Sequence, residues 1–231
     1  MKPFLYLDNW DRFQPRNRME VLLDASGVEV VRVLANTGAM PDQLDFCGAF
    51  VGPSDAAAYD DVAWVNSEKM FLSKAALRGI PVLGLCFGSQ ILAAALLGPQ
   101  AVFRRTKREA GVAPIWLTAD GSADALARGL PRAMEVFHWH GDEIIAAHAD
   151  MILLASSGEC ANQMWRWRHG PVWGIQPHPE YASEQMHEWL VNDRCRFESG
   201  GLDVDGLLGQ RLDYESVGAV FENFMDFCGT K

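Results

Sequence analysis

One cysteine of this chain occupies a turn that could present its sulfur as a nucleophile. Cys86 stands between Gly84 and Gly88 in a G-x-C-x-G pattern, which follows an apolar run and opens an apolar helical run. In such an elbow the glycines permit a tight turn, and the nucleophile lies at the carboxyl edge of a sheet. The helix start favours a thiolate, and the Phe87 N–H would face a developing oxyanion. The alternative is a buried cysteine in an ordinary strand-to-helix turn.

A histidine and a glutamate two residues apart form the second chemical feature. In QPHPE a proline follows Gln176 and another follows His178, which favours extended backbone at both positions. Residues two apart in an extended chain face the same side, so His178 and Glu180 can project together. Glu180 would orient the imidazole, and His178 would accept the thiol proton of Cys86. The alternative is a surface turn with an incidental pair; the combination with the elbow is the specific signal.

Composition and charge exclude several classes of function. The chain has 231 residues, with 20 Lys and Arg against 30 Asp and Glu, and its formal net charge is −10. Because this charge repels phosphate backbones, we expect no nucleic-acid partner. Basic residues within 104–108 are interpreted as a solvated segment; the alternative is a docking patch for a partner or an anionic acceptor. No apolar run approaches the roughly 20 residues of a membrane span, so we expect no membrane partner.

The cysteines and the first residues predict a location. The five cysteines are odd in number, widely spaced and without a CxxC pair, at Cys47, Cys86, Cys160, Cys195 and Cys228. This pattern indicates neither a disulfide framework nor a zinc knuckle. The opening MKPFLYLDNWDRF meets acidic residues at once and has no signal-peptide pattern. We therefore expect a reducing, cytoplasmic location.

Hydrophobic patterning predicts an α/β fold. Strands are expected at residues 4–7, 28–34, 46–51 and 81–85, and helices at 16–25, 67–77 and 89–97. Further strands are expected at 101–103, 111–117, 134–137, 152–155, 163–167 and 172–175, and helices at 183–197 and 216–227. The alternation predicts a three-layer sandwich with a mostly parallel central sheet and additional antiparallel strands in the second half. Ligands of such sheets bind at the carboxyl ends of the strands.

Taken together, these segments resemble the class I (triad) glutamine amidotransferases, most closely the amidotransferase domain of GMP synthetase and its stand-alone relatives. GLCFGSQILAAALLG is similar to that family's elbow helix, and QPHPE to its histidine–glutamate segment. FVGPSDAAAYDDVAWV resembles its glycine–proline loop, REAG its E-x-G strand, HWHGDEI its H-G-D segment, and residues 154–163 the strand that follows. The resemblance ends near residue 195, so we expect an amidotransferase domain at 1–196 and a C-terminal helical extension at 197–231, packed on the same domain.

The resemblance implies a flavodoxin-like fold and a role for individual residues. The catalytic triad would be Cys86, His178 and Glu180. The oxyanion donors would be Gly52 and Phe87, although Val51 stands where the family loop often has a second glycine. No cofactor is implied.

The resemblance also implies a wall for the glutamine moiety. It would consist of Gln90, His140 and Asp142. The alternating spacing of His138, His140 and Asp142 could also suit a metal ion. Because a metal site needs three or more ligands with a supporting shell, we favour the substrate wall and expect no metal.

Several functions stay open at this point. The first is hydrolysis of glutamine to glutamate and ammonia through a Cys86 γ-glutamyl-thioester, with a separate synthetase subunit using the ammonia, because the chain has no S-G-G-x-D-S synthetase segment. The second is a stand-alone γ-glutamyl hydrolase or peptidase. The third is a non-catalytic interaction module, which loss of a triad residue would mark. An α/β-hydrolase with a cysteine elbow is disfavoured, because its acid precedes its histidine whereas Glu180 follows His178.

Overall fold

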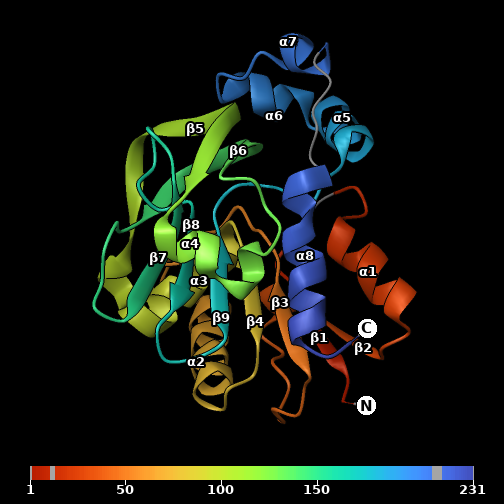
Figure 1. Cartoon of the computed structure of the whole chain (residues 1–231), viewed down its shortest axis with the longest axis vertical. Coiled ribbons are helices and arrows are strands. Elements are labelled where there is room, and N and C mark those ends of the chain that lie inside the picture. Colours follow the sequence, from red (N-terminus) through yellow and green to blue (C-terminus); the bar gives the residue numbers. More distant parts are fainter. Residues whose placement is uncertain (1, 11–13, 210–214, 231) are drawn as a thin grey trace.

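A single mixed β-sheet forms the centre of the computed structural model, which describes residues 2–10, 14–209 and 215–230 (Figure 1). Its strands are β1 (Phe4–Asp8), β2 (Val30–Leu34), β3 (Gly48–Val51), β4 (Val82–Leu85), β5 (Val102–Leu117), β6 (Ala133–Ile144), β7 (Met151–Ser156), β8 (Met164–Trp167) and β9 (Val172–Ile175). Their order across the sheet is β2-β1-β3-β4-β9-β8-β7-β5-β6. The pairs from β2 through to β9 are parallel, and those from β9 through to β6 are antiparallel. The predicted α/β fold is therefore confirmed.

The β5–β6 hairpin differs from the sequence prediction. The segments expected at 101–103 and 111–117 belong to one strand, β5, and the strand expected at 134–137 continues to Ile144. The two strands pair along most of their length, with a register shift between Arg104 and Glu109. Pairing between the two strands satisfies the backbone N–H and C=O groups of these polar stretches. The stretches lack the alternation of apolar and polar residues that would have predicted a strand.

Helices cover both faces of the sheet. They are α1 (Arg18–Ser26), α2 (Ala63–Leu77), α3 (Phe87–Leu97), α4 (Ala119–Ala123), α5 (Ser183–Asn192), α6 (Arg194–Ser199), α7 (Val204–Leu208) and α8 (Glu215–Phe227). Figure 1 shows α2 and α3 behind the sheet and α1, α4 and α8 in front of it. The single helix expected at 183–197 is interrupted at Asp193, whose φ of −106° and ψ of 21° are not helical. Its carboxylate accepts a hydrogen bond from Trp189 and pairs with Arg196.

The two faces of the sheet bury separate cores. Leu5 and Leu7 of β1 pack in the core with α2 and α3, whereas Phe4 and Tyr6 of the same strand pack in the core with α1 and α8. On the α8 side, the rings of Phe4 and Phe224 lie 6.2 Å apart. Burial on both faces explains why the parallel strands are continuously apolar.

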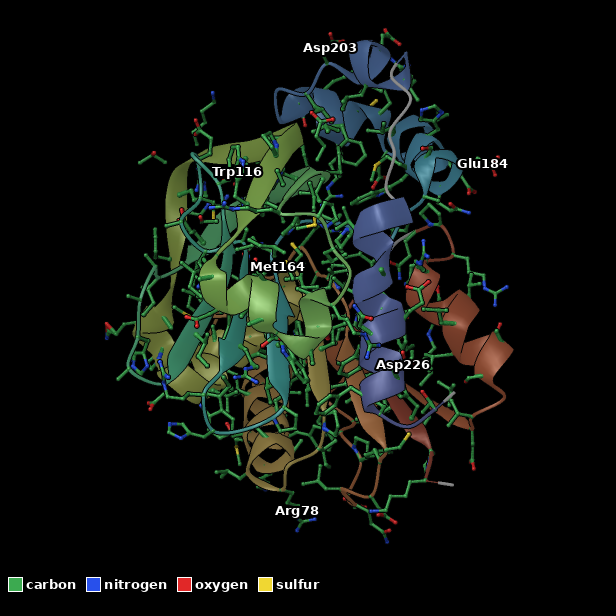
Figure 2. The ribbon with its side chains drawn as sticks, viewed as in Figure 1. Arg78, Trp116, Met164, Glu184, Asp203 and Asp226 are labelled. Atoms are coloured by element: carbon green, nitrogen blue, oxygen red, sulfur yellow. The ribbon has the colours of Figure 1, made fainter. Side chains whose placement is uncertain are left out.

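A third cluster of apolar side chains covers one end of the molecule. It joins Trp10 and Trp139 to residues of α5, α6 and α7, among them Trp189 and Phe197. Figure 2 places Asp203, at the start of α7, at this end and Arg78, which follows α2, at the opposite end. Within the described ranges, no helix combines the length and the apolar character that crossing a membrane requires.

Candidate active site

The Cys86 elbow is the strained point of the backbone. Cys86 joins β4 to α3 and has φ 51° and ψ −107°, the one positive φ at a non-glycine residue within the described ranges. Such a conformation costs about 1–3 kcal/mol and persists only where the surroundings enforce it. Here the Cys86 N–H donates to Ile175 O of β9 at 2.8 Å, which anchors the turn to the neighbouring strand.

Close backbone packing explains both glycines of the elbow. A Cβ on Gly84 would lie 2.4 Å from Gly88 O, and a Cβ on Gly88 would lie 2.1 Å from Val51 O. Both contacts are far inside van der Waals distance and both involve backbone atoms, which cannot easily shift. The pattern G-x-C-x-G is therefore required by the approach of α3 to β3 and β4.

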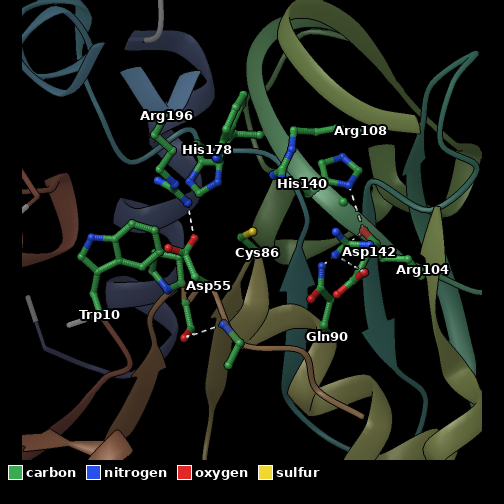
Figure 3. A pocket seen from close by; sticks show the side chains of 15 residues that line it. Trp10, Asp55, Cys86, Gln90, Arg104, Arg108, His140, Asp142, His178 and Arg196 are labelled. Atoms are coloured by element: carbon green, nitrogen blue, oxygen red, sulfur yellow. Dashed lines mark hydrogen bonds and ion pairs between the residues drawn. The ribbon is translucent and has the colours of Figure 1, made fainter. Parts of the chain in front are cut away.

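His178 and Glu180 form the buried pair that the sequence predicts. His178 Nδ1 and Glu180 Oε1 lie 2.8 Å apart, and both side chains are almost fully buried. The His178 N–H donates to Phe137 O at 2.8 Å, and the Trp189 ring of α5 packs edge-on against the imidazole. Nε2 has no hydrogen-bond partner within the described part of the chain, and His178 lines the same pocket as Cys86 (Figure 3).

The electrostatics of this pair favour a protonated imidazole. Burial alone would lower the pKa of His178, but the carboxylate of Glu180 and the sulfur of Cys86 outweigh it and raise the pKa to about 10. An imidazolium beside the sulfur stabilises a thiolate, which is the nucleophilic form of cysteine.

The predicted substrate-wall residues gather on the side of the pocket opposite His178. Gln90 Nε2 donates to Asp142 O at 3.3 Å and to Gln176 Oε1 at 3.2 Å, and His140 Nδ1 lies 2.9 Å from Asp142 O. Gln176 also directs its Nε2 toward Cys86 Sγ, 3.8 Å away. The structure therefore brings Gln90, His140 and Asp142 together around one pocket with Cys86.

Glu109, rather than Asp142, is the carboxylate beside the two histidines. Its oxygens lie 3.5 Å from His138 Nδ1 and 2.9 Å from His140 Nε2, and the possible ligand atoms of the three residues all lie within 4.8 Å of one another. Gln163 Nε2 already donates to both Glu109 oxygens, at 3.2 and 3.1 Å. Burial would raise the pKa of Glu109, but His140, His138 and Gln163 outweigh it and lower the pKa. We interpret the cluster as a buried support that orients His140.

The two predicted oxyanion donors differ in their surroundings. Phe87 is the first residue of α3, where N–H groups lack acceptors within the helix. The Gly52 N–H instead donates to Leu7 O at 2.9 Å, so its service as an oxyanion donor requires that this bond open. The loop after Gly52 does line the pocket, through residues 53–56.

Sequence reasoning did not identify several residues of the pocket. Trp10, Asp55, Arg108, Trp139 and Arg196 also line it. Figure 3 shows Trp10, Asp55 and Arg196 on one side of Cys86 and Arg108 on the other. Arg196 comes from α6 and pairs with Asp55, 141 residues away in the sequence. No local pattern links such residues; the basic residues within 104–108 were the one available signal.

The class of protein is settled by comparison with known families. The family model "Glutamine amidotransferase class-I" matches residues 22–196. The chain belongs to this family of enzymes, for which a Cys-His-Glu triad is typical. The predicted family is confirmed.

Curated relatives and solved structures agree with this assignment. A glutamine-hydrolysing GMP synthase of Serratia proteamaculans is 32% identical over 130 residues, which are 52% of this chain and 24% of that protein. One subunit of the glutamine-hydrolysing GMP synthase of Methanospirillum hungatei is 34% identical over 104 residues, which are 45% of this chain and 53% of that relative. The matches thus span about a quarter and about half of these relatives. A glutamine amidotransferase structure from Thermotoga maritima shares the fold, with a TM-score of 0.83, 20% identity, and coverage of 98% of this chain and 97% of that one.

Proposed function

We propose that this chain hydrolyses the γ-amide of glutamine with Cys86 as nucleophile, His178 as base and acid, and Glu180 as orienting carboxylate. The observation that carries the proposal is the strained Cys86 in the same pocket as a buried imidazole that Glu180 holds at 2.8 Å. Family membership supports the same chemistry.

The proposed reaction proceeds in two halves. Cys86 Sγ attacks the γ-carbonyl carbon, and the Phe87 N–H stabilises the oxyanion. His178 donates a proton to the leaving nitrogen, so ammonia departs and a γ-glutamyl-thioester remains. Water then gives a proton to His178 and attacks the thioester, which releases glutamate and regenerates the Cys86 sulfur. Gln90, His140 and Asp142 hold the glutamine moiety during both halves.

We further propose that a separate synthetase subunit receives the ammonia. The relative from Methanospirillum hungatei is one subunit of its GMP synthase, which supports an enzyme divided between two chains. We place the protein in the cytoplasm, because Cys47, Cys86, Cys160, Cys195 and Cys228 are all free thiols.

Purified protein assayed with glutamine and with γ-glutamyl dipeptides tests the proposal. We expect release of ammonia from glutamine, and covalent labelling of Cys86 by a diazoketone analogue of glutamine. The Cys86→Ala variant is the matched control and should lose both signals. Turnover of dipeptides without turnover of glutamine would instead establish a γ-glutamyl peptidase, and activity that survives in Cys86→Ala would eliminate the thioester mechanism.

A further inference from the structure

Arg108 is a half-buried cation in the catalytic pocket. It extends from β5 and lines the pocket together with Cys86 (Figure 3). Its guanidinium lies over the Trp139 ring, 4.4 Å from the centroid. Within residues 2–10, 14–209 and 215–230, it makes no ion pair and no hydrogen bond through its side chain. Burying a charge without a partner is unfavourable, so the position calls for an anion.

The other two arginines of the pocket are neutralised by carboxylates. Arg104 lies 3.2 Å from Asp142 Oδ1, and Arg196 pairs with Asp55 and with Asp193. Among the described residues, Arg108 is therefore the pocket arginine that forms no ion pair with a carboxylate. Burial first, and then the charges of Arg196 and Arg104, lower the pKa of Arg108, and the weaker attraction of Cys86 and Asp55 does not outweigh them. A bound anion would offset these unfavourable effects on the guanidinium.

The guanidinium of Arg108 suits a carboxylate. Its contact with the Trp139 ring uses no hydrogen-bond acceptor, so its N–H donors, which lie in the plane of the group, stay available. A guanidinium edge matches the two oxygens of a carboxylate and can bind both of them. In glutamine the leaving group is ammonia, so the α-carboxylate is the anionic group that the substrate brings into the pocket.

We propose that Arg108 binds the α-carboxylate of the γ-glutamyl substrate and so positions its γ-carbonyl at Cys86. This inference rests on the function proposed above. Because glutamine and γ-glutamyl peptides share the γ-glutamyl unit, the site selects that unit and is indifferent to the leaving amine. Amides that lack the α-carboxylate are then poor ligands.

Calorimetric binding to the Cys86→Ala protein tests the site without turnover. The ligands are glutamine and 4-aminobutanamide, which is glutamine without its α-carboxylate. We expect Arg108→Met to weaken glutamine binding about 10- to 100-fold, the size of a charge-assisted interaction, and to leave 4-aminobutanamide binding unchanged. Arg108→Lys should recover part of the loss. The matched control is Lys107→Met, which removes the same charge from the adjacent, exposed position of β5 and should change glutamine binding less than twofold.

Each outcome distinguishes the site from the proposed function. If Arg108→Met does not change glutamine binding by the Cys86→Ala protein, the carboxylate site is wrong, while glutamine hydrolysis still stands. Equal weakening of both ligands would also overturn it, because Arg108 would then act on the fold of the pocket rather than on the carboxylate. Failure of the native protein to bind or hydrolyse glutamine would reject the proposed function, and the carboxylate site with it.

Discussion

Replacing Glu180 by Gln tests whether a buried carboxylate holds the proton on His178. The substitution keeps the size of the side chain and removes the negative charge 2.8 Å from Nδ1. In the native protein, burial lowers the pKa of His178, but Glu180 and Cys86 outweigh it and raise the pKa to about 10 from an ordinary value of 6.5. The folded state therefore holds this proton more tightly than the unfolded state. The resulting stabilisation is complete below pH 6.5 and is lost as the pH rises through about 10.

The size of this stabilisation follows from the difference between the two pKa values of His178, about 10 in the folded protein and 6.5 ordinarily. Each pKa unit corresponds to about 1.4 kcal/mol, so the full shift corresponds to about 5 kcal/mol of unfolding free energy. Cys86 also raises the pKa, so removing Glu180 alone should abolish about 2–5 kcal/mol of it at pH 6.5. The difference between the native protein and Glu180→Gln should then shrink steadily toward pH 10.

Urea unfolding of both proteins between pH 6.5 and 10 measures this difference. Glu188→Gln is the control, because Glu188 is exposed on the nearby helix α5 and should give a curve parallel to that of the native protein. If the curves of Glu180→Gln and the native protein run parallel as well, Glu180 does not hold the proton on His178, and our account of the pair is wrong.

Three other substitutions test the elbow and a buried acid. Cys86→Gly and Cys86→Ala should both abolish labelling by a diazoketone analogue of glutamine, but the Gly variant should have the higher unfolding free energy, by about 1 kcal/mol, because both lack the thiol and glycine alone tolerates the positive φ. A Gly variant no more stable than the Ala variant would contradict strain at Cys86. Gly88→Ala should lower the unfolding free energy by about 1–3 kcal/mol, because the new Cβ would lie 2.1 Å from Val51 O. The control Gly158→Ala should be nearly neutral, because a Cβ there would have no atom within 4 Å. Equal denaturant midpoints for the two variants would refute the packing argument. Burial raises the pKa of Glu68 to about 7, so the folded state is destabilised relative to the unfolded state as the pH rises above 4.5. Glu68→Gln should therefore stabilise the protein by up to about 3 kcal/mol at pH 8 and have no effect near pH 4. Thermal unfolding of both proteins at the two pH values measures this difference, and an equal effect at both would contradict the raised pKa.

The placement of Cys86, His178 and Glu180 was predictable because its signals are local. The glycines around Cys86 and the prolines around His178 restrict the backbone within a few residues, so the sequence determines the turn and the extended segment directly. Strands buried on both faces, such as β4 and β9, were predictable for a similar reason, since their continuous apolar runs differ from the surrounding sequence.

Features that depend on distant contacts were not predictable. The full length of β5 and β6 depends on their pairing with each other. Asp55, Arg108 and Arg196 converge only because three separate segments meet at one pocket. The division of the chain at residue 196 and the roles of the individual site residues stay predictions.

The packing of α8 has a consequence for synthesis on the ribosome. Phe4 and Phe50 lie on the sheet face that Phe224 and Phe221 of α8 cover, and β1 emerges more than 200 residues before that helix. At about 5–20 residues per second, this aromatic face stays open to water for roughly 10–40 seconds. We therefore expect nascent chains stalled before α8 to bind chaperones that recognise exposed apolar surface, and to release them once α8 has emerged.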